Sequence, residues 1–156
     1  MPTITGTERP ARLLRARPQP ACFVCGQDNP RGLKIDYQCG DDGEVTATWT
    51  PSRELEGFRG IVHGGLVSTV LDEAMSKAVA AAGCEALTAE LRVRFRRPVA
   101  SAGVYLIRGW ILDRGKRLIK TEAALSTHDG TECAHAWAIF LSLSGASFRA
   151  RSAADT

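Results

Sequence analysis

The residues with the clearest chemical potential lie in one stretch, Ile61–Met75, which reads IVHGGLVSTVLDEAM. It places two glycines, Gly64 and Gly65, at the start of a predicted helix, where a ligand can approach the backbone closely. The first turn of a helix has unpaired N–H groups and the positive end of the helix dipole. Such donors suit an anionic oxygen, including the oxyanion of a tetrahedral intermediate, although a plain loop-to-helix turn would have the same sequence.

A carboxylate, Asp72, lies two turns further along the same predicted helix, in an otherwise apolar setting. It shares a stripe with Ser68 and Ser76. A carboxylate on a mostly buried helix is energetically costly, so Asp72 is a candidate general base or nucleophile. Glu73 has Lys77 four residues later, the favoured order for a helical ion pair, and is interpreted as structural.

The histidines do not form a metal-binding pattern. His63 directly precedes the glycine pair, where a capping or packing role and a functional role are both compatible with the sequence. His128 falls in a predicted turn and His135 in a predicted strand, so no pair has metal-ligand spacing. The sequence therefore predicts no metal.

Five cysteines are present: Cys22, Cys25, Cys39, Cys84 and Cys133. Their odd number and irregular spacing argue against a disulfide framework and favour reduced thiols in a cytoplasmic protein. Cys22 and Cys25 form a lone Cys-x-x-Cys without a second pair at zinc-ribbon spacing. We interpret this pair as part of a packed loop near the candidate site, rather than as a metal or redox centre.

Hydrophobic periodicity predicts the elements that position these residues. Apolar residues at helical spacing predict one long helix from about Gly64 to Ala82, with Gly83 as its C-cap. From Leu87 to Phe95, apolar residues alternate strictly with polar ones, which is typical of a strand. The predicted strands are Leu33–Cys39, Glu44–Trp49, Leu87–Phe95, Val104–Leu112, Leu118–Ser126 and Cys133–Leu143. Short turns predict antiparallel connections between the last four strands, hence an α+β fold in which a curved antiparallel sheet wraps a long central helix.

Length and composition favour one globular domain. The chain has 156 residues, 44% of them hydrophobic and 24% charged, with a net charge of +3. No apolar run approaches the ~20 residues that cross a bilayer, so we expect no membrane association. Residues 1–21 are predicted to be a disordered or extended N-terminal arm, because Pro18, Pro20 and the lack of periodicity favour an irregular segment. The segment lacks the apolar core of a secretory signal, and its arginine-rich composition leaves a transit peptide as the alternative. The domain is predicted at 22–145, with a C-terminal tail at 146–156.

With these elements in place, the sequence resembles the hot-dog thioesterase superfamily. The segment His63–Gly65 followed by a helical Asp72 is similar to that superfamily's motif. The segments Cys22–Gly26 and Asn29–Leu33 are similar to a segment of the branch that contains phenylacetate-pathway and 4-hydroxybenzoyl-CoA thioesterases. The run Arg94–Val99 adds to the likeness, which covers nearly all of the predicted domain. The resemblance implies a hot-dog fold.

The resemblance also implies an activity and a site. By position, Asp72 would be the catalytic carboxylate of an acyl-CoA thioesterase, and another subunit would supply it to each site. The oxyanion-hole N–H would belong to Gly64, with Gly65 beside it. His63 would shape the turn, and the Thr88 hydroxyl would help to position water. The implied protein is a homodimer or homotetramer that uses no cofactor and binds acyl-CoA.

Two other functions on the same fold are compatible with parts of the sequence. A non-catalytic module that binds acyl-CoA or an acyl carrier would keep the groove, but it would not need a buried carboxylate. A hydratase of the same superfamily usually has a histidine on the helix a few residues from the aspartate, and none follows Asp72 here.

One feature of the resemblance is missing from this sequence. Some thioesterases carry an Asn or Gln in the loop before the histidine, and the loop Glu54–Ile61 has neither.

Basic residues could hold the phosphates of coenzyme A, although most of them are expected on a solvated strand face. The pool is Arg92, Arg94, Arg96, Arg97, Lys116 and Arg117. Nucleic-acid binding is not expected, because no aromatic residue other than Phe95 is interleaved with these charges.

The size of the acyl pocket is expected to depend on the side chains of four residues, Trp49, Phe58, Val62 and Met75.

Overall fold

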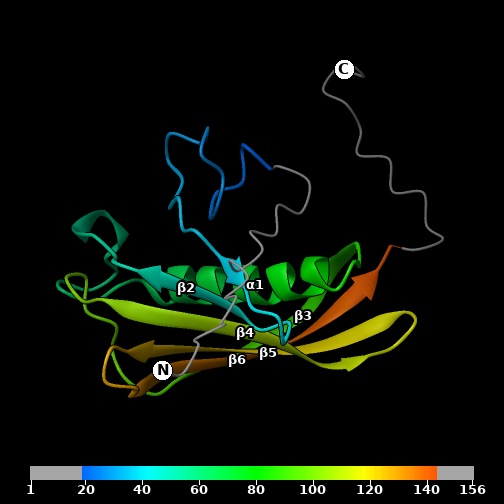
Figure 1. Cartoon of the computed structure of the whole chain (residues 1–156). Coiled ribbons are helices and arrows are strands. Elements are labelled where there is room, and N and C mark those ends of the chain that lie inside the picture. Colours follow the sequence, from blue (N-terminus) through cyan, green and yellow to red (C-terminus); the bar gives the residue numbers. More distant parts are fainter. Residues whose placement is uncertain (1–18, 144–156) are drawn as a thin grey trace, which may run out of the picture.

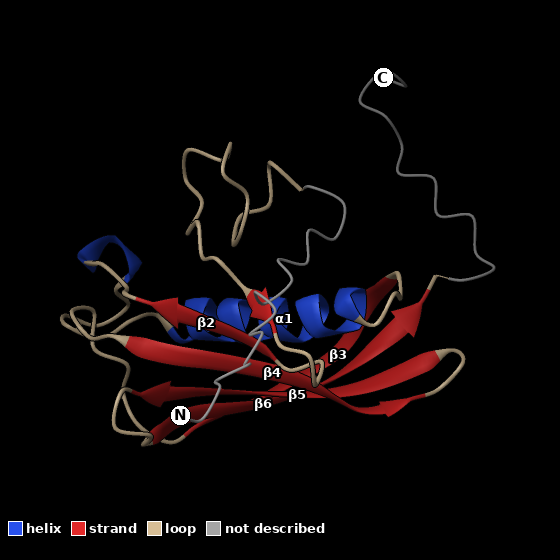
Figure 2. Ribbon diagram, viewed as in Figure 1, coloured by secondary structure: helices blue, strands red, loops and turns tan. Residues whose placement is uncertain are grey.

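The computed structural model describes residues 19–143, which form one long helix packed on one antiparallel sheet (Figures 1 and 2). The predictions for residues 1–18 and 144–156 lie outside the described residues. The elements are β1 (Gln38–Cys39), β2 (Val45–Trp49), the 3-10 helix η1 (Arg53–Leu55), α1 (Gly64–Ala81), β3 (Ala86–Phe95), β4 (Tyr105–Arg114), β5 (Leu118–Thr127) and β6 (Glu132–Ser142). The strand order in the sheet is β1-β2-β4-β5-β6-β3. The predicted hot-dog architecture is confirmed.

The core lies between α1 and the concave face of the sheet, as the two layers in Figure 2 show. The buried side chains of α1 are Val67, Val70, Leu71, Ala74, Met75, Ala78 and Val79. Full burial of the larger ones stabilises the fold by roughly 1.5–3 kcal/mol each. The helix approaches β4 so closely that a Cβ on Gly109 would lie 2.7 Å from the Ala74 backbone, so only glycine fits there. No helix among residues 19–143 is long and apolar enough to cross a membrane.

The first predicted strand is shorter than expected, because only Gln38–Cys39 joins the sheet. The preceding residues bind another segment instead. The Leu33 N–H donates to the Phe23 carbonyl at 2.8 Å, and the Ile35 N–H donates to the Val24 carbonyl at 2.9 Å. Lys34 between them has a φ of 53°, which interrupts an extended strand. The other helix and strand bounds agree with prediction within one or two residues.

The position of β3 corrects the predicted connection between β3 and β4. The β4–β5 and β5–β6 pairs are antiparallel neighbours as expected, but β3 pairs with β6 at the opposite edge of the sheet from β1 and β2. The segment 96–104 is not a tight hairpin, because its backbone pairs elsewhere. The Val62 N–H donates to the Val99 carbonyl at 2.8 Å, and Ile61 forms an antiparallel bridge with Ala100.

A register shift between Thr88 and Glu90 breaks the strict alternation expected in β3. Thr88 is opposite the buried Phe140, while further along the strand Leu91 is opposite the buried Ala138. Directly opposed residues share a face, so Thr88 lies on the helix side together with Leu91. The bulge at Ala89 therefore turns Thr88 toward α1, which simple alternation would not do.

Candidate active site

The start of α1 is closed by its own N-cap residue, His63. The Gly65 N–H donates to His63 Nδ1 at 2.9 Å, and the His63 carbonyl accepts from the N–H groups of Leu66 and Val67. A Cβ on Gly65 would lie 3.0 Å from His63 Nδ1, so a glycine suits this cap. Of the two roles that the sequence left open for His63, capping is the one observed. Among the described residues the Gly64 N–H has no acceptor, so it remains available to a ligand.

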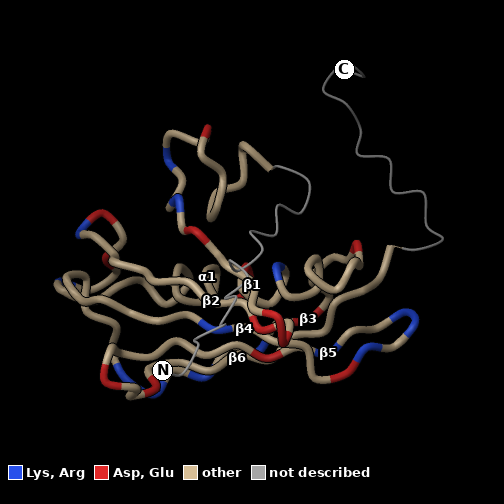
Figure 3. The backbone as a smooth tube through the Cα atoms, in the orientation of Figure 1, with Lys and Arg blue, Asp and Glu red and all other residues tan. Residues whose placement is uncertain are grey.

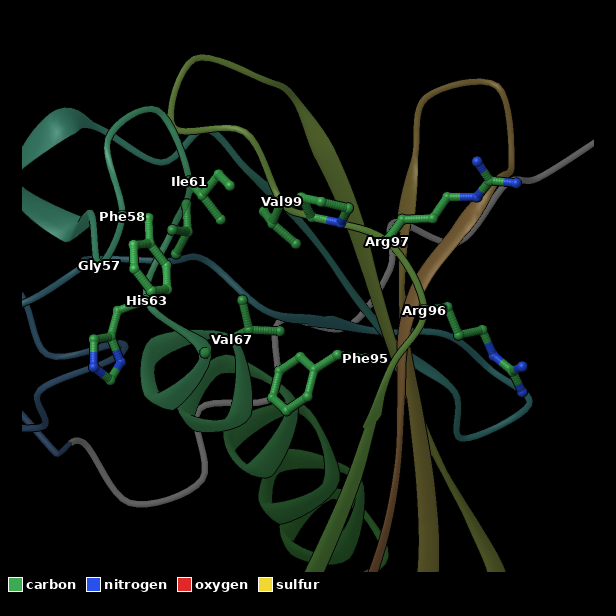
Figure 4. Close-up of a pocket in the computed structure, with 12 residues that line it drawn as sticks. Gly57, Phe58, Ile61, His63, Val67, Phe95, Arg96, Arg97 and Val99 are labelled. Carbon is green, nitrogen blue, oxygen red and sulfur yellow. The ribbon is translucent and has the colours of Figure 1, made fainter.

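A largely apolar cavity of about 450 Å³ opens beside this helix start (Figure 4). The residues that line it are Gly57, Phe58, Ile61, Val62, His63, Gly64, Val67, Phe95, Arg96, Arg97, Pro98 and Val99. Phe58 and Phe95 are 83% and 53% exposed and lie at its mouth. Two of the expected pocket residues, Phe58 and Val62, line the cavity. The other two, Trp49 and Met75, are buried in the core instead.

Few of the basic residues are near this cavity. Only Arg96 and Arg97 of the predicted pool line it, and in Figure 4 both side chains extend away from Phe58. The Arg96 Nε lies 2.8 Å from a Glu132 carboxylate oxygen. The Arg92 guanidinium stacks over the Trp137 ring at 4.7 Å. Figure 3 shows the basic residues spread over several parts of the fold, so the structure does not single out a phosphate site.

Asp72 is half-buried on α1, where the Thr88 hydroxyl donates to its Oδ1 at 2.8 Å. Burial raises the pKa of Asp72 above its ordinary value, the Thr88 hydrogen bond opposes that rise, and the negative charge of Glu73 adds to it. None of the ion pairs within residues 19–143 includes Asp72. An uncompensated carboxylate with a raised pKa has the properties of a general base.

Within one chain the candidate residues form two groups. His63, Gly64 and Gly65 lie at the helix start, whereas Asp72 and Thr88 lie about 12 Å further along the helix axis, given a rise of ~1.5 Å per residue. Asp72 does not line the cavity. A single subunit therefore does not bring the carboxylate to the Gly64 N–H.

Some of the residues around the cavity were not singled out in the sequence. Val67 and Val99 are buried beneath it, and Phe95 ends β3 beside the helix start. A Cβ placed on Gly64 would lie 3.4 Å from the Phe95 ring. The sequence places Phe95 at the end of an apolar strand and within the run Arg94–Val99 that adds to the family likeness, but neither feature indicates that the strand end meets the glycine pair.

Comparisons with known proteins agree with this fold. The sequence profile of the thioesterase superfamily matches residues 59–134. The chain is 26% identical over 128 residues to the acyl-coenzyme A thioesterase THEM4 of Bos taurus, covering 80% of this chain and 52% of THEM4. It thus spans about half the length of that relative.

Solved structures of thioesterase-superfamily proteins have a similar fold. The thioesterase superfamily protein RHA08564 is 28% identical with a TM-score of 0.74, over 77% of this chain and 62% of that one. The E. coli PaaI protein from the phenylacetic acid degradation operon has the same fold, with a TM-score of 0.66 at 19% identity over 70% of this chain and 80% of that one. Residues 59–134 belong to the thioesterase superfamily, and the chain that contains them has the hot-dog fold.

Proposed function

We propose that this protein is an acyl-CoA thioesterase, which hydrolyses a thioester to a free acid and coenzyme A. The observation that carries the proposal is the environment of Asp72. This carboxylate is half-buried, has no cationic partner among the described residues, and is held by the Thr88 hydroxyl at 2.8 Å. Burying a carboxylate without a cation costs free energy, and a catalytic role for the Asp72 oxygen atoms explains why this residue is placed there.

The geometry of β3 supports a site shared between two copies of the chain. β3 is a sheet edge, and it exposes Leu91 and Phe95 on the helix side. One end of β3 holds Asp72 through Thr88, and the other end places Phe95 against Gly64. Antiparallel pairing of two such edges would set each Thr88 end beside the partner's Phe95 end. The Asp72 carboxylate of one copy would then approach the helix start of the other.

In the proposed reaction the acyl group lies in the apolar cavity and the thioester carbonyl oxygen accepts from the Gly64 N–H. The Asp72 carboxylate takes a proton from water as the water oxygen attacks the carbonyl carbon. Alternatively, the carboxylate attacks that carbon itself, and water hydrolyses the resulting mixed anhydride to the free acid after the thiolate has left. The tetrahedral intermediate then collapses, the C–S bond breaks, and the coenzyme A thiolate leaves and is protonated. One oxyanion donor is typically worth ~10²–10³ in rate, and a general base ~10²–10⁴.

The substrate class also draws support from a relative. THEM4, which is 26% identical, bears the name acyl-coenzyme A thioesterase. The cavity of about 450 Å³ is lined mainly by apolar side chains, as an acyl group requires.

The test is hydrolysis of a panel of acyl-CoA substrates with short, long and aryl acyl groups, measured by release of the free thiol. Asp72→Asn is expected to lower kcat by ~10²–10⁴ on every substrate that the wild type hydrolyses. Asp113→Asn, at an exposed position in β4, is the matched control and should keep the wild-type rate. Wild-type rates for Asp72→Asn would contradict the proposal. No hydrolysis of any substrate, with tight coenzyme A binding, would favour a binding module.

A further inference from the structure

The segment before β1 lies on the helix side of the molecule (Figure 1), and it brings the Cys-x-x-Cys pair to α1. Cys22 and Cys25 are both half-buried free thiols. The Cys22 Sγ lies 3.7 Å from Glu73 Oε1, and the two sulfurs and a Glu73 oxygen all lie within 4.8 Å of one another. Glu73 therefore supplies a third potential metal ligand beside the two cysteines. It lies on α1, 48 residues after Cys25, so nothing in the sequence indicated that the three residues meet.

Backbone hydrogen bonds hold the cysteine loop in shape. The Gly26 N–H donates to the Cys22 carbonyl at 2.9 Å, and the loop is tied to the next segment by the Leu33–Phe23 and Ile35–Val24 bonds described above. A Cβ on Gly26 would lie 2.4 Å from the Pro20 carbonyl oxygen, so the turn closes only around glycine. The two sulfur atoms are therefore held close together by a turn with a defined backbone conformation.

We propose that Cys22, Cys25 and Glu73 form a binding site for a divalent transition metal cation, with zinc as the best match. Two thiolates and one carboxylate suit a cation of borderline softness and do not suit calcium or magnesium. Tetrahedral zinc, with bonds of ~2.3 Å to sulfur and ~2.1 Å to oxygen, requires a sulfur-to-oxygen separation of about 3.6 Å. The observed 3.7 Å between Cys22 Sγ and Glu73 Oε1 meets this requirement.

The charge around the cluster balances such a cation. Two thiolates and a carboxylate carry one negative charge more than a divalent cation neutralises. The Lys77 ammonium, 3.6 Å from Glu73 Oε1, supplies the remaining positive charge. A partner outside the ligand set commonly orients and tunes metal ligands in this way.

The cluster is accessible, and it is separate from the proposed catalytic carboxylate. An open cavity of about 500 Å³ includes Cys22, Glu73 and Lys77 in its lining, which gives a cation a path to the ligands. Glu73 follows Asp72 directly, but adjacent helix positions are rotated by about 100° around the axis. The bound metal would join the loop before β1 to α1 and would contribute to folding, with water at its fourth position.

The test uses the full chain, purified under reducing conditions and stripped with a chelator. Cobalt(II) is expected to bind with a stoichiometry of one per chain, and to give the visible bands of a tetrahedral site and thiolate-to-metal charge transfer. Zinc should displace it. Metal analysis of the protein before stripping should show zinc. A reduced wild-type protein that binds neither cation would overturn the proposal.

Variants separate the proposed site from adventitious thiol binding. Cys25→Ser should remove the charge-transfer band attributable to that thiolate, and the isosteric Glu73→Gln should weaken zinc binding by ~10–100-fold or more. Cys39→Ala, which removes a cysteine outside the cluster, should bind zinc as the wild type does. Circular dichroism checks that each variant is folded. Equal affinity in Glu73→Gln and wild type would overturn the proposal, as would a Cys22–Cys25 disulfide that persists under reductant.

Discussion

Two adjacent carboxylates on α1, Asp72 and Glu73, have opposite surroundings. Asp72 faces β3, where the neutral hydroxyl of Thr88 donates a hydrogen bond to it, and burial raises the pKa of Asp72. Glu73 faces the cysteine loop and forms an ion pair with Lys77 at 3.6 Å. Because the two are one residue apart, the helix turns them in different directions.

The comparison shows how one helix can carry a reactive group and a structural group side by side. The Glu73 carboxylate is engaged by the Lys77 ammonium and lies beside the Cys22 sulfur, so its oxygen atoms serve the structure. A carboxylate that is partly desolvated without a cation keeps a proton more readily and can accept one during a reaction. The two residues are both acidic, so their different roles follow from the different surroundings that each side chain faces.

The largest effect that would sharpen this comparison is expected from Thr88→Val. A hydrogen bond to a charged group contributes ~1.5–3 kcal/mol, so its loss should lower kcat about tenfold or more. Because the Thr88 hydrogen bond lowers the pKa of Asp72, the acidic limb of the pH–rate profile should move to higher pH. Thr88→Ser should restore most of the rate. An unchanged profile in Thr88→Val would show that this hydroxyl does not support Asp72.

A smaller effect is expected in the stability of Asp72→Asn. The folded-state pKa of Asp72 is raised, so its ionised form costs stability at neutral pH. With allowance for partial solvent exposure, Asn should raise the free energy of unfolding by roughly 1 kcal/mol, the low end for burying a polar group. The gain should be full above the folded-state pKa and should vanish below the unfolded-state value of ~3.9. Urea unfolding at several pH values measures it, and a loss of stability at neutral pH would contradict the comparison.

The smallest effect is expected from Lys77→Met in metal-stripped protein, and its sign is opposite. Here the change removes the partner of Glu73, so stability should fall by ~0.5–1 kcal/mol, the upper part of the range for ion pairs near a surface. This decrease in the free energy of unfolding should be smaller at high salt, because salt screens the ion pair. If Lys77→Met and Asp72→Asn both stabilised the protein, the distinction between the two carboxylates would fail.

Much of the fold could be predicted from local sequence patterns. The apolar spacing from Leu66 onward predicts α1, and Gly83, with a φ of 79°, follows its C-terminal end as expected. The turns at Gly43 and Gly130 both have the positive φ that favours glycine. These features depend on residues a few positions apart, so a single sequence contains the information that specifies them.

Parts of the candidate site could not be predicted in this way. The bulge at Ala89 depends on how β3 matches β6, and alternation in β3 alone would place Thr88 away from Asp72. Glu73 has a helical ion-pair partner in the sequence, and its contact with the Cys22 sulfur arises only because the loop folds onto α1. In both cases the decisive partner lies far away along the chain.

The sequence alone determined the long helix, most of the strands, the glycine pair at the helix start, and the presence of an acid two turns along that helix. Each of these follows from hydrophobic periodicity or from backbone preferences within a few residues. Only the tertiary structure decided that β3 pairs with β6, that Thr88 reaches Asp72, and that Glu73 joins the cysteine pair. Strand register and loop packing are set by contacts across the core, which local patterns do not specify.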